Sequence, residues 1–145
     1  MATTETMKAR DVMHQGTQCV GESETLLDAA RMMRDLDVGC VPICGEDNRL
    51  KGMITDRDIA VRCVAEGMSP GNVRAGAFAG QLFWIDADAS ITEALETMET
   101  HQIKRLPVID VRDGHRLVGM ISETNLARNI PDAMMAEFVE RVYAV

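Results

Sequence analysis

Two stretches of the chain repeat hydrophobic residues at the spacing of one helix face. In the first stretch these residues are Leu26, Ala29, Ala30 and Met33. In the second stretch they are Ile91, Ala94, Leu95 and Met98. Spacings of three and four residues are typical of an amphipathic helix with one buried face. We therefore expect a helix in each stretch.

Each of these helices begins with the pattern of a capping box. Thr25 and Ser90 can accept hydrogen bonds from backbone N–H groups of the first helical turn. Asp28 and Glu93, three residues later, can accept in return from the N–H of the capping residue. The helices are thus expected to begin directly after Thr25 and Ser90.

Short strands are expected on both sides of each helix. Around the first helix they are Thr17–Val20, Cys40–Cys44 and Leu50–Ile54. Around the second helix they are Leu82–Ile85, Leu106–Ile109 and Leu117–Ile121. Polar turns at 45–48 and 110–115 join the last two strands of each set as hairpins. Further helices are expected from Asp56, from Glu123, over Met7–Met13 and over Pro131–Tyr143.

The chain contains two copies of one motif. Thr25–Ala29 corresponds to Ser90–Ala94, and Leu50–Ala60 corresponds to Leu117–Ala127. Each copy predicts a β-α-β-β-α unit that is too small to bury both faces of its three-stranded sheet. We therefore expect an α/β (α+β) fold in which two repeats pack with pseudo-twofold symmetry. The expected bounds are 8–66 for repeat 1, 67–72 for a linker, 73–130 for repeat 2 and 131–145 for a C-terminal helix.

Composition excludes several classes of protein. The 145 residues include 15 Lys and Arg against 23 Asp and Glu, a formal charge of −8, with no basic stripe. This balance disfavours binding to a nucleic-acid backbone. No run of about 18 apolar residues exists, and residues 1–8 lack the apolar core of a signal peptide. We expect no membrane segment and a cytoplasmic location.

No pattern of an enzyme or of a metal site is found. The sequence lacks a nucleophile, a base and an orienting group in one motif, and it lacks a phosphate-cradling Gly-rich loop. It has no C-x-x-C, and His14, His101 and His115 lie at no ligand-like spacing. We expect neither catalysis nor a bound metal.

The four cysteines leave two alternatives open. Reduced thiols are the default in a cytoplasmic protein, and Cys40 and Cys63 fit that default. Cys19 and Cys44 differ because the first and second strands of such a unit are parallel neighbours, about 4.8 Å apart. That spacing is compatible with a disulfide. Our hypothesis is that Cys19 and Cys44 bridge the two strands.

The doubled pattern of a hydrophobic-x-Pro strand followed by Gly-Met-Ile-Thr-x-x-Asp resembles a tandem CBS-domain protein, a Bateman module. Within that family, four segments resemble a small stand-alone type. They are 17–22, 41–45, 52–59 and 101–108. The resemblance implies a regulatory, non-catalytic module, dimeric through its helical faces, which often binds adenosine-containing ligands between its repeats.

The resemblance also implies one good nucleotide site. Thr55 ends a strand, where its hydroxyl and the first helical N–H groups suit a phosphate. Asp58 lies one turn later, and its carboxylate can accept from both hydroxyls of a ribose. The family pattern adds contacts to the base and to the phosphate. The predicted site is Met53, Thr55, Asp58, Leu82, Phe83, Lys104 and Arg105.

A second, weaker site is expected from the other repeat. Asn125 replaces the ribose-binding Asp there, and Gly39 and Cys40 replace the basic pair. The residues of this weaker site are Thr17, Gln18, Met120, Ser122 and Asn125.

Structural roles compete with each of these assignments. Thr55-x-x-Asp58 is also a capping box. Lys104 and Arg105 can equally be surface charges paired with Glu99 or Asp110.

We therefore expect a module that requires no cofactor, binds an adenine nucleotide of the AMP, ADP or ATP class, and signals to a separate, unknown effector protein. The alternative is a ligand-free structural or redox- and stress-linked interaction protein with vestigial clefts.

Overall fold

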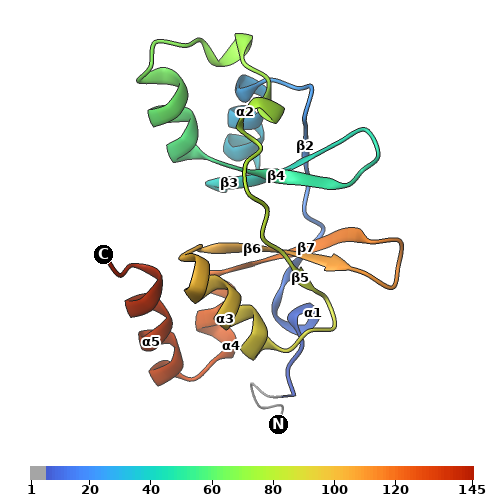
Figure 1. Ribbon diagram of the computed structural model, residues 1–145, viewed down its shortest axis with the longest axis vertical. Helices are drawn as coiled ribbons and strands as arrows, with labels where there is room; N and C mark the ends of the chain where they lie inside the picture. The colour runs from blue at the N-terminus through green and yellow to red at the C-terminus, as the bar shows by residue number, and fades with distance from the viewer. Residues whose placement is uncertain (1–5) are drawn as a thin grey trace. The chain divides into compact units, whose positions relative to one another are not determined.

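The computed structural model describes residues 6–145, which divide into two compact units. Unit 1 consists of the described residues through Thr17 together with Phe83–Val145, and unit 2 consists of Gln18–Leu82. Each unit has its own sheet and its own hydrophobic core (Figure 1). The expectation about a signal peptide falls partly on residues 1–5, outside the described residues.

Unit 2 contains the three-stranded sheet predicted for one repeat. Its strands are β2 (Val20–Gly21), β3 (Cys40–Cys44) and β4 (Leu50–Thr55), in that order across the sheet. β2 runs parallel to β3, and β3 and β4 form an antiparallel hairpin. Its helical segments are α2 (Leu26–Leu36), η1 (Asp58–Val64), η2 (Pro70–Asn72) and η3 (Ala75–Phe78).

Unit 1 repeats this arrangement and adds elements at both ends. Its sheet has four strands in the order β1 (His14–Gln15), β7 (Arg116–Ser122), β6 (Arg105–Asp110) and β5 (Ile85–Asp86). β5 runs parallel to β6, whereas β1 and β6 run antiparallel to β7. Its helices are α1 (Ala9–Val12), α3 (Ile91–His101), α4 (Glu123–Asn129) and α5 (Asp132–Val142).

The two amphipathic helices begin where the sequence predicts. Thr25 Oγ1 accepts from the N–H of Asp28, and the Asp28 carboxylate accepts from the N–H of Thr25. Ser90 Oγ accepts from the N–H of Glu93, but the structure shows no complete capping box there. Both helices end in a left-handed residue, Asp37 or Gln102. The expectation of a reciprocal box is thus confirmed for α2 and wrong for α3.

The first strand of each repeat is shorter than predicted and lies later in the chain. Residues 17–20 were expected as a strand, but pairing to β3 starts only at Val20 and continues through Gly21. Residues 82–85 were expected similarly, and pairing to β6 starts only at Ile85. Each predicted segment therefore begins before the hydrogen-bonded ladder, and only its last residue belongs to the strand. β1, η2 and η3 were not predicted at all.

The first element packed on each repeat comes from a distant part of the sequence. α1 donates from the N–H groups of Ala9 and Arg10 to the carbonyls of Ala89 and Ala87. In unit 2, η3 donates correspondingly from Ala75 and Gly76 to Glu24 and Glu22. The N-terminal segment thus packs on the second repeat, and the segment containing η3 packs on the first repeat. For this reason the two units do not follow the order of the chain. The repeat bounds 8–66, 67–72, 73–130 and 131–145 remain predictions.

Ionic contacts also fix α1 to unit 1. Arg10 Nε lies 3.0 Å from Asp88 Oδ1, and Arg10 Nη2 lies 3.3 Å from Asp110 Oδ2. Lys8 and Arg112 also lie within ion-pair distance of Asp88. The hydrogen bond from Arg10 lowers the pKa of Asp88 below its ordinary value. The entry segment is therefore held by charge as well as by backbone hydrogen bonds.

Two glycines of the repeated Gly-Met-Ile motif allow a close crossing of the chain. A Cβ on Gly52 would lie 2.9 Å from the Cα of Ala79. A Cβ on Gly119 would lie 2.6 Å from the carbonyl oxygen of His14. Both distances are too short for any side chain, so the motif glycines make room for the segment that enters each unit.

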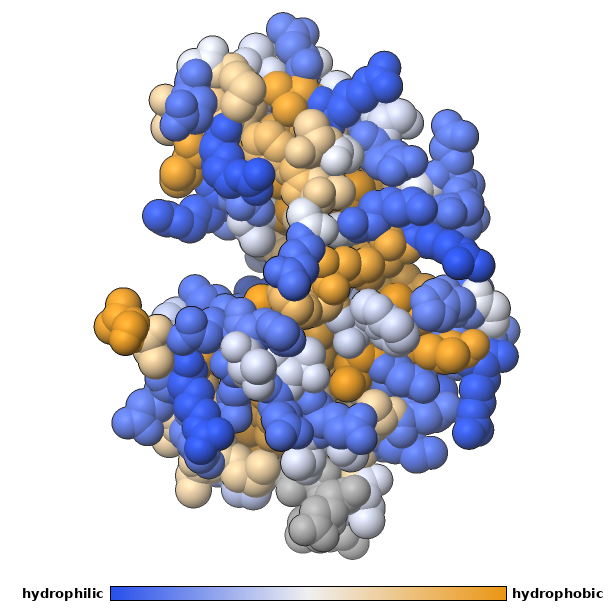
Figure 2. All heavy atoms as spheres, in the orientation of Figure 1, coloured by the Kyte–Doolittle hydropathy of each residue, from blue (hydrophilic) through white to orange (hydrophobic). Residues whose placement is uncertain are grey.

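The cores are aliphatic, in keeping with an aromatic content of only 3%. Unit 2 buries Val20, Leu26, Ile43 and Ile54 completely. In unit 1, Phe138 of α5 is fully buried among aliphatic side chains and Met98. On the face shown in Figure 2, hydrophilic side chains predominate and hydrophobic ones are visible in smaller areas. No helix among residues 6–145 is long and apolar enough to cross a membrane.

Candidate functional site

Thr55 and Asp58 form a capping box at the junction of β4 and the following helix. Asp58 Oδ2 accepts from the N–H of Thr55 at 3.0 Å, and Thr55 Oγ1 accepts from the N–H of Asp58 at 3.0 Å. The capping role considered for this motif is therefore present. It occupies Oδ2 and leaves Oδ1 of Asp58 for other donors.

The second oxygen of Asp58 faces a cation from its own helix. Arg62 Nη1 lies 3.5 Å from Asp58 Oδ1. The Cζ of Arg62 lies 4.4 Å from the ring centroid of Phe78, at the end of η3. Asp58 therefore stands beside a guanidinium that the predicted site did not include.

The other two predicted residues of unit 2 are partly accessible. Met53 lies in β4 opposite Pro42 of β3, and it is half-buried. Leu82, the last residue of unit 2, is also half-buried. Both keep apolar surface available for contact.

Each predicted residue in unit 1 already has a partner there. The ammonium of Lys104 lies 4.2 Å from the ring centroid of Tyr143, a cation–π distance. Arg105 Nη1 donates to the carbonyl oxygen of Lys104 at 3.0 Å. The ring of Phe83 stacks on the imidazole of His101, with centroids 3.9 Å apart.

The surface pairing considered for the two basic residues is wrong. Glu99 pairs with Arg141 at 3.3 Å, and Asp110 pairs with Arg10. Lys104 instead uses an aromatic ring that the sequence pattern did not indicate.

The predicted site is divided between the two units. Met53, Thr55, Asp58 and Leu82 belong to unit 2, whereas Phe83, Lys104 and Arg105 belong to unit 1. Each half is described within its own unit, and the assembly of the two halves remains a prediction.

The weaker predicted site has the same local geometry in unit 1. Asn125 Oδ1 accepts from the N–H of Ser122 at 2.9 Å and also from its hydroxyl. Arg105 is the cross-strand partner of Ser122, just as Cys40 is the partner of Thr55 in unit 2. Within one unit, the basic pair therefore lies beside Ser122. That Lys104 and Arg105 approach Asp58, which belongs to unit 2, remains a prediction.

Three further residues were assigned to the weaker site. Met120 lies opposite Pro107 and also opposite His14, between its two neighbouring strands. The Thr17 hydroxyl is buried and has no hydrogen-bond partner among the described residues. A buried hydroxyl without a partner is unfavourable. Gln18 is exposed and belongs to unit 2.

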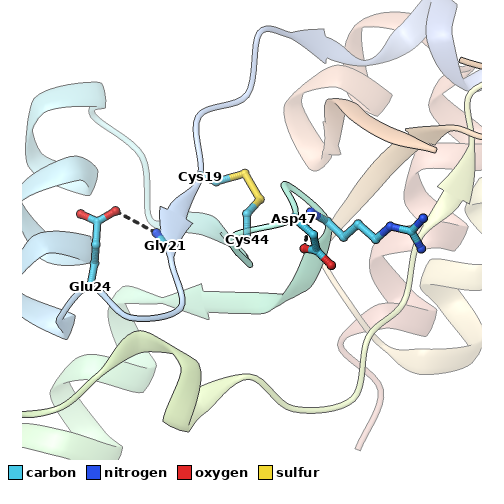
Figure 3. Close-up of a disulfide and its surroundings, with 6 residues drawn as sticks. Cys19, Gly21, Glu24, Cys44 and Asp47 are labelled. Carbon is cyan, nitrogen blue, oxygen red and sulfur yellow. Dashed lines mark hydrogen bonds between the residues drawn. A yellow bond between two sulfur atoms is a disulfide. The ribbon is translucent and has the colours of Figure 1, made fainter. Parts of the chain in front are cut away.

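The structure contains the hypothesised disulfide. Cys19 precedes β2 and Cys44 ends β3, and their Cα atoms lie 5.7 Å apart (Figure 3). The parallel pairing of Gly21 with Cys44 brings the two segments together, as the strand argument requires. Glu24 accepts from the N–H of Gly21 beside the bridge. Cys63 is buried, whereas Cys40 is only half-buried.

The contacts of the candidate residues differ in how far the sequence indicates them. Arg62 follows Asp58 by four residues, and this spacing on a helix is a signal from which their contact could have been predicted. Phe78 and Tyr143 lie far along the chain from the cations they contact, and no local pattern links them.

Among residues 6–145, no group of three His, Cys, Asp or Glu side chains is arranged to hold a metal ion.

Comparison with protein families identifies the repeat. The family model described as CBS domain matches residues 9–64 and again residues 79–132. The chain belongs to the CBS-domain family. Its two copies form a tandem CBS pair, and proteins of this family are generally regulatory modules.

Similar proteins extend this comparison. The chain is 47% identical over 135 residues to hypoxic response protein 1 of Mycobacterium tuberculosis. The aligned residues cover 92% of each chain. A crystal structure of hypoxic response protein I with two coordinated zinc ions has a TM-score of 0.78 and 50% identity, and covers 86% of this chain and 100% of that one. A CBS domain protein from Pyrobaculum aerophilum complexed with AMP has a TM-score of 0.77 and 21% identity, covering 92% and 98%.

The zinc ions in the structure of hypoxic response protein I raise the question whether this chain's described residues fit such a site. Zinc sites require three or four nitrogen, sulfur or carboxylate ligands in one place. Residues 6–145 contain no such group, and the disulfide consumes two of the four thiols. These residues therefore do not fit a zinc site formed within one chain.

Proposed function

We propose that the protein is a non-catalytic regulatory CBS pair that binds an adenosine-containing ligand of the AMP, ADP or ATP class. Residues of both repeats contribute, and Asp58 receives the ribose. The protein would act in the cytoplasm and signal to a separate effector protein. A ligand regulates only if it prefers one of two conformations, so the bound state must differ from the free one.

The carboxylate of Asp58 is the observation that carries this proposal. Its Oδ2 is used by the N–H of Thr55, but Oδ1 has only a long contact with Arg62. An ionised carboxylate accepts hydrogen bonds without donating any, which suits two ribose hydroxyls. The similar fold of the Pyrobaculum aerophilum protein, solved with AMP, supports the choice of ligand class.

The ligand-free alternative is not favoured. The disulfide that formed part of it is present, but a bridge inside unit 2 is compatible with ligand binding and explains no separate activity.

A calorimetric panel tests the proposal. AMP, ADP, ATP and S-adenosylmethionine would be titrated into the wild type, Asp58→Ala and the matched variant Asn125→Ala. We expect heat of binding from at least one nucleotide, loss of that heat in Asp58→Ala, and little change in Asn125→Ala. No heat from any ligand, or equal binding by Asp58→Ala, would overturn the proposal.

We further propose that the protein is a homodimer in which two copies contact through helical faces of unit 2. In unit 1, α5 packs on α3 and α4 and buries Phe138 and Val142. In unit 2, α2, η1 and the residues that follow each of them leave apolar side chains exposed. They are Leu36, Val38, Val61, Val64 and Met68.

Light scattering after size exclusion tests this second proposal. The wild type should have twice the mass of one chain, and Val64→Asp should be monomeric because a buried, unpaired carboxylate is costly. Val111→Asp, at an exposed position in the hairpin of unit 1, is the matched control. A monomeric wild type, or a Val64→Asp variant that remains dimeric, would contradict the proposal.

A further inference from the structure

Arg62 lies between two groups that restrict its guanidinium. Its Nη1 is 3.5 Å from Asp58 Oδ1, and its Cζ is 4.4 Å from the ring centroid of Phe78. The side chain is 54% exposed, compared with 27% for Asp58. Asp58 and Arg62 are on the same face of η1, one turn apart, and Phe78 contributes from η3. All three residues belong to unit 2, so this arrangement needs no contact from the other repeat.

The contact with Asp58 uses little of the guanidinium's capacity. At 3.5 Å the donor and acceptor are further apart than in a normal N–H···O bond. A guanidinium has five N–H donors in one plane, and among the described residues Arg62 has no partners other than Asp58 and Phe78. Because an arginine stacked on a ring keeps its N–H groups at the edge of the plane, they remain available to a planar or tetrahedral anion.

The basic residues of unit 1 also have partners inside their own unit. Lys104 is held over the ring of Tyr143, whose hydroxyl in turn donates to Glu123 at 2.7 Å. Arg105 donates to the carbonyl oxygen of Lys104. An anion that recruited either cation would have to compete with a contact inside its own unit.

We propose that Arg62 is the phosphate-binding residue of the Asp58 site and that Phe78 positions it. This inference rests on the proposed nucleotide function and assigns the phosphate to unit 2 rather than to Lys104 and Arg105. Arginine binds phosphate through charge-assisted, often bidentate hydrogen bonds. When a nucleotide binds, Arg62 leaves Asp58 Oδ1 for the phosphate, and a ribose hydroxyl takes its place on that oxygen.

This exchange couples recognition of the phosphate to recognition of the ribose. A nucleoside without phosphate gives Arg62 no new partner, so the guanidinium continues to compete for Asp58 Oδ1. A mononucleotide satisfies the guanidinium and releases the carboxylate oxygen at the same time. Arg62 therefore determines the preference for a phosphorylated ligand.

Calorimetry with AMP, adenosine and inorganic phosphate tests the assignment in four proteins. These are the wild type, Arg62→Gln, Phe78→Leu and Arg57→Gln. Arg57 is the matched control because it is exposed near the start of the same helix and its side chain has no ion-pair or hydrogen-bond partner among residues 6–145, while its backbone N–H donates to Asp56.

We expect Arg62→Gln to weaken AMP binding about ten- to one-hundredfold, the range for a hydrogen bond to a charged group. Its adenosine affinity should stay equal or rise, because the competitor for Asp58 Oδ1 is gone. Phe78→Leu should weaken AMP binding about two- to fivefold, the range for an exposed cation–π contact, without weakening adenosine binding. Arg57→Gln should change neither affinity, and thermal melting should show that all variants remain folded.

Three outcomes would overturn the assignment. Unchanged AMP affinity in Arg62→Gln would exclude contact with phosphate. Equal losses for AMP and adenosine would show that Arg62 acts only through Asp58. Inorganic phosphate that binds the wild type as tightly as AMP would indicate a free anion site instead. Failure of the proposed function is distinguishable, because the wild type itself would then bind neither AMP nor adenosine.

Discussion

The backbone N–H groups of Thr55 and Asp58 are each satisfied by the other residue's side chain, at 3.0 Å in both directions. In unit 1, Ser122 and Asn125 make the same exchange with an amide in place of the carboxylate. The capping geometry therefore tolerates Asn. Only the Asp58 version carries a negative charge on the oxygen that is not used for capping.

This comparison predicts that Asp58→Asn separates folding from binding. Asn and Asp are about equally good as local acceptors of backbone N–H groups, so the melting temperature should change little. Nucleotide affinity should fall, because the amide presents an NH₂ donor where a ribose hydroxyl needs an acceptor. Thermal melting and AMP titration of the same preparation check both statements. A large loss of stability without loss of binding would contradict them.

Thr55→Ala should lower the stability of the fold. Loss of the capping hydroxyl is expected to cost about 1 kcal/mol of unfolding free energy. Urea unfolding followed by circular dichroism measures it, and Ser122→Ala is the equivalent change in unit 1. A stability equal to that of the wild type would show that the capping bond contributes nothing.

The glycine of the repeated motif should resist any side chain. Gly52→Val would force its Cβ against Ala79, and we expect a loss of about 1–3 kcal/mol, the usual cost of overpacking. Gly80→Ala in the same unit is the control, since a Cβ there meets no atom within 4 Å. Equal stabilities of the two variants in urea unfolding would disprove the close crossing.

The disulfide between Cys19 and Cys44 predicts two reactive thiols, not four, in the denatured and unreduced protein. The bridge closes a loop with a sequence separation of 25 residues, for which chain entropy gives about 3 kcal/mol of stabilisation. Cys19→Ser should therefore melt at a lower temperature than the wild type, and a reducing agent should abolish the difference. Cys63→Ala is less suitable as a control because Cys63 is buried, so Ser69→Ala, at an exposed position, serves better. A count of four thiols would end the disulfide account.

The pair of Arg10 and Asp88 predicts a dependence of stability on acid. Because the pKa of Asp88 is lowered in the folded protein, its contribution is complete above the unfolded value of about 3.9. That contribution is lost as the pH falls through the lower, folded pKa. Asp88→Asn should therefore flatten part of the acid limb of the stability curve while losing stability at neutral pH. Unfolding measured from neutral pH to pH 2 checks this, and an unchanged acid limb would contradict it.

The parts of the fold that the sequence predicted are those set by local chemistry. The spacing of Leu26 and Met33, the cap at Thr25 and the polar hairpin turns each act within a few residues, so the central helices and hairpins agree with the structure. The packing of the N-terminal segment on the second repeat could not be predicted, because the contact of Gly119 with His14 joins distant parts of the chain.

The candidate site shows the same limit. Thr55 and Asp58 were identified from one motif, and their geometry is local. The stacking of Arg62 on Phe78 and of Lys104 on Tyr143 depends on how later segments fold back, which no spacing along the sequence indicates. The sequence therefore indicated the cations at 104 and 105 as candidates but not the aromatic rings that Arg62 and Lys104 contact.

Recognition of the ribose by Asp58 is the central claim, and the affinity of the wild type for AMP relative to 2′-deoxy-AMP tests it most directly. The two ligands share base and phosphate and differ in one hydroxyl. The account predicts that 2′-deoxy-AMP binds about tenfold more weakly than AMP, or weaker still, because a hydrogen bond to a charged acceptor is lost. Equal affinity for both ligands would contradict it.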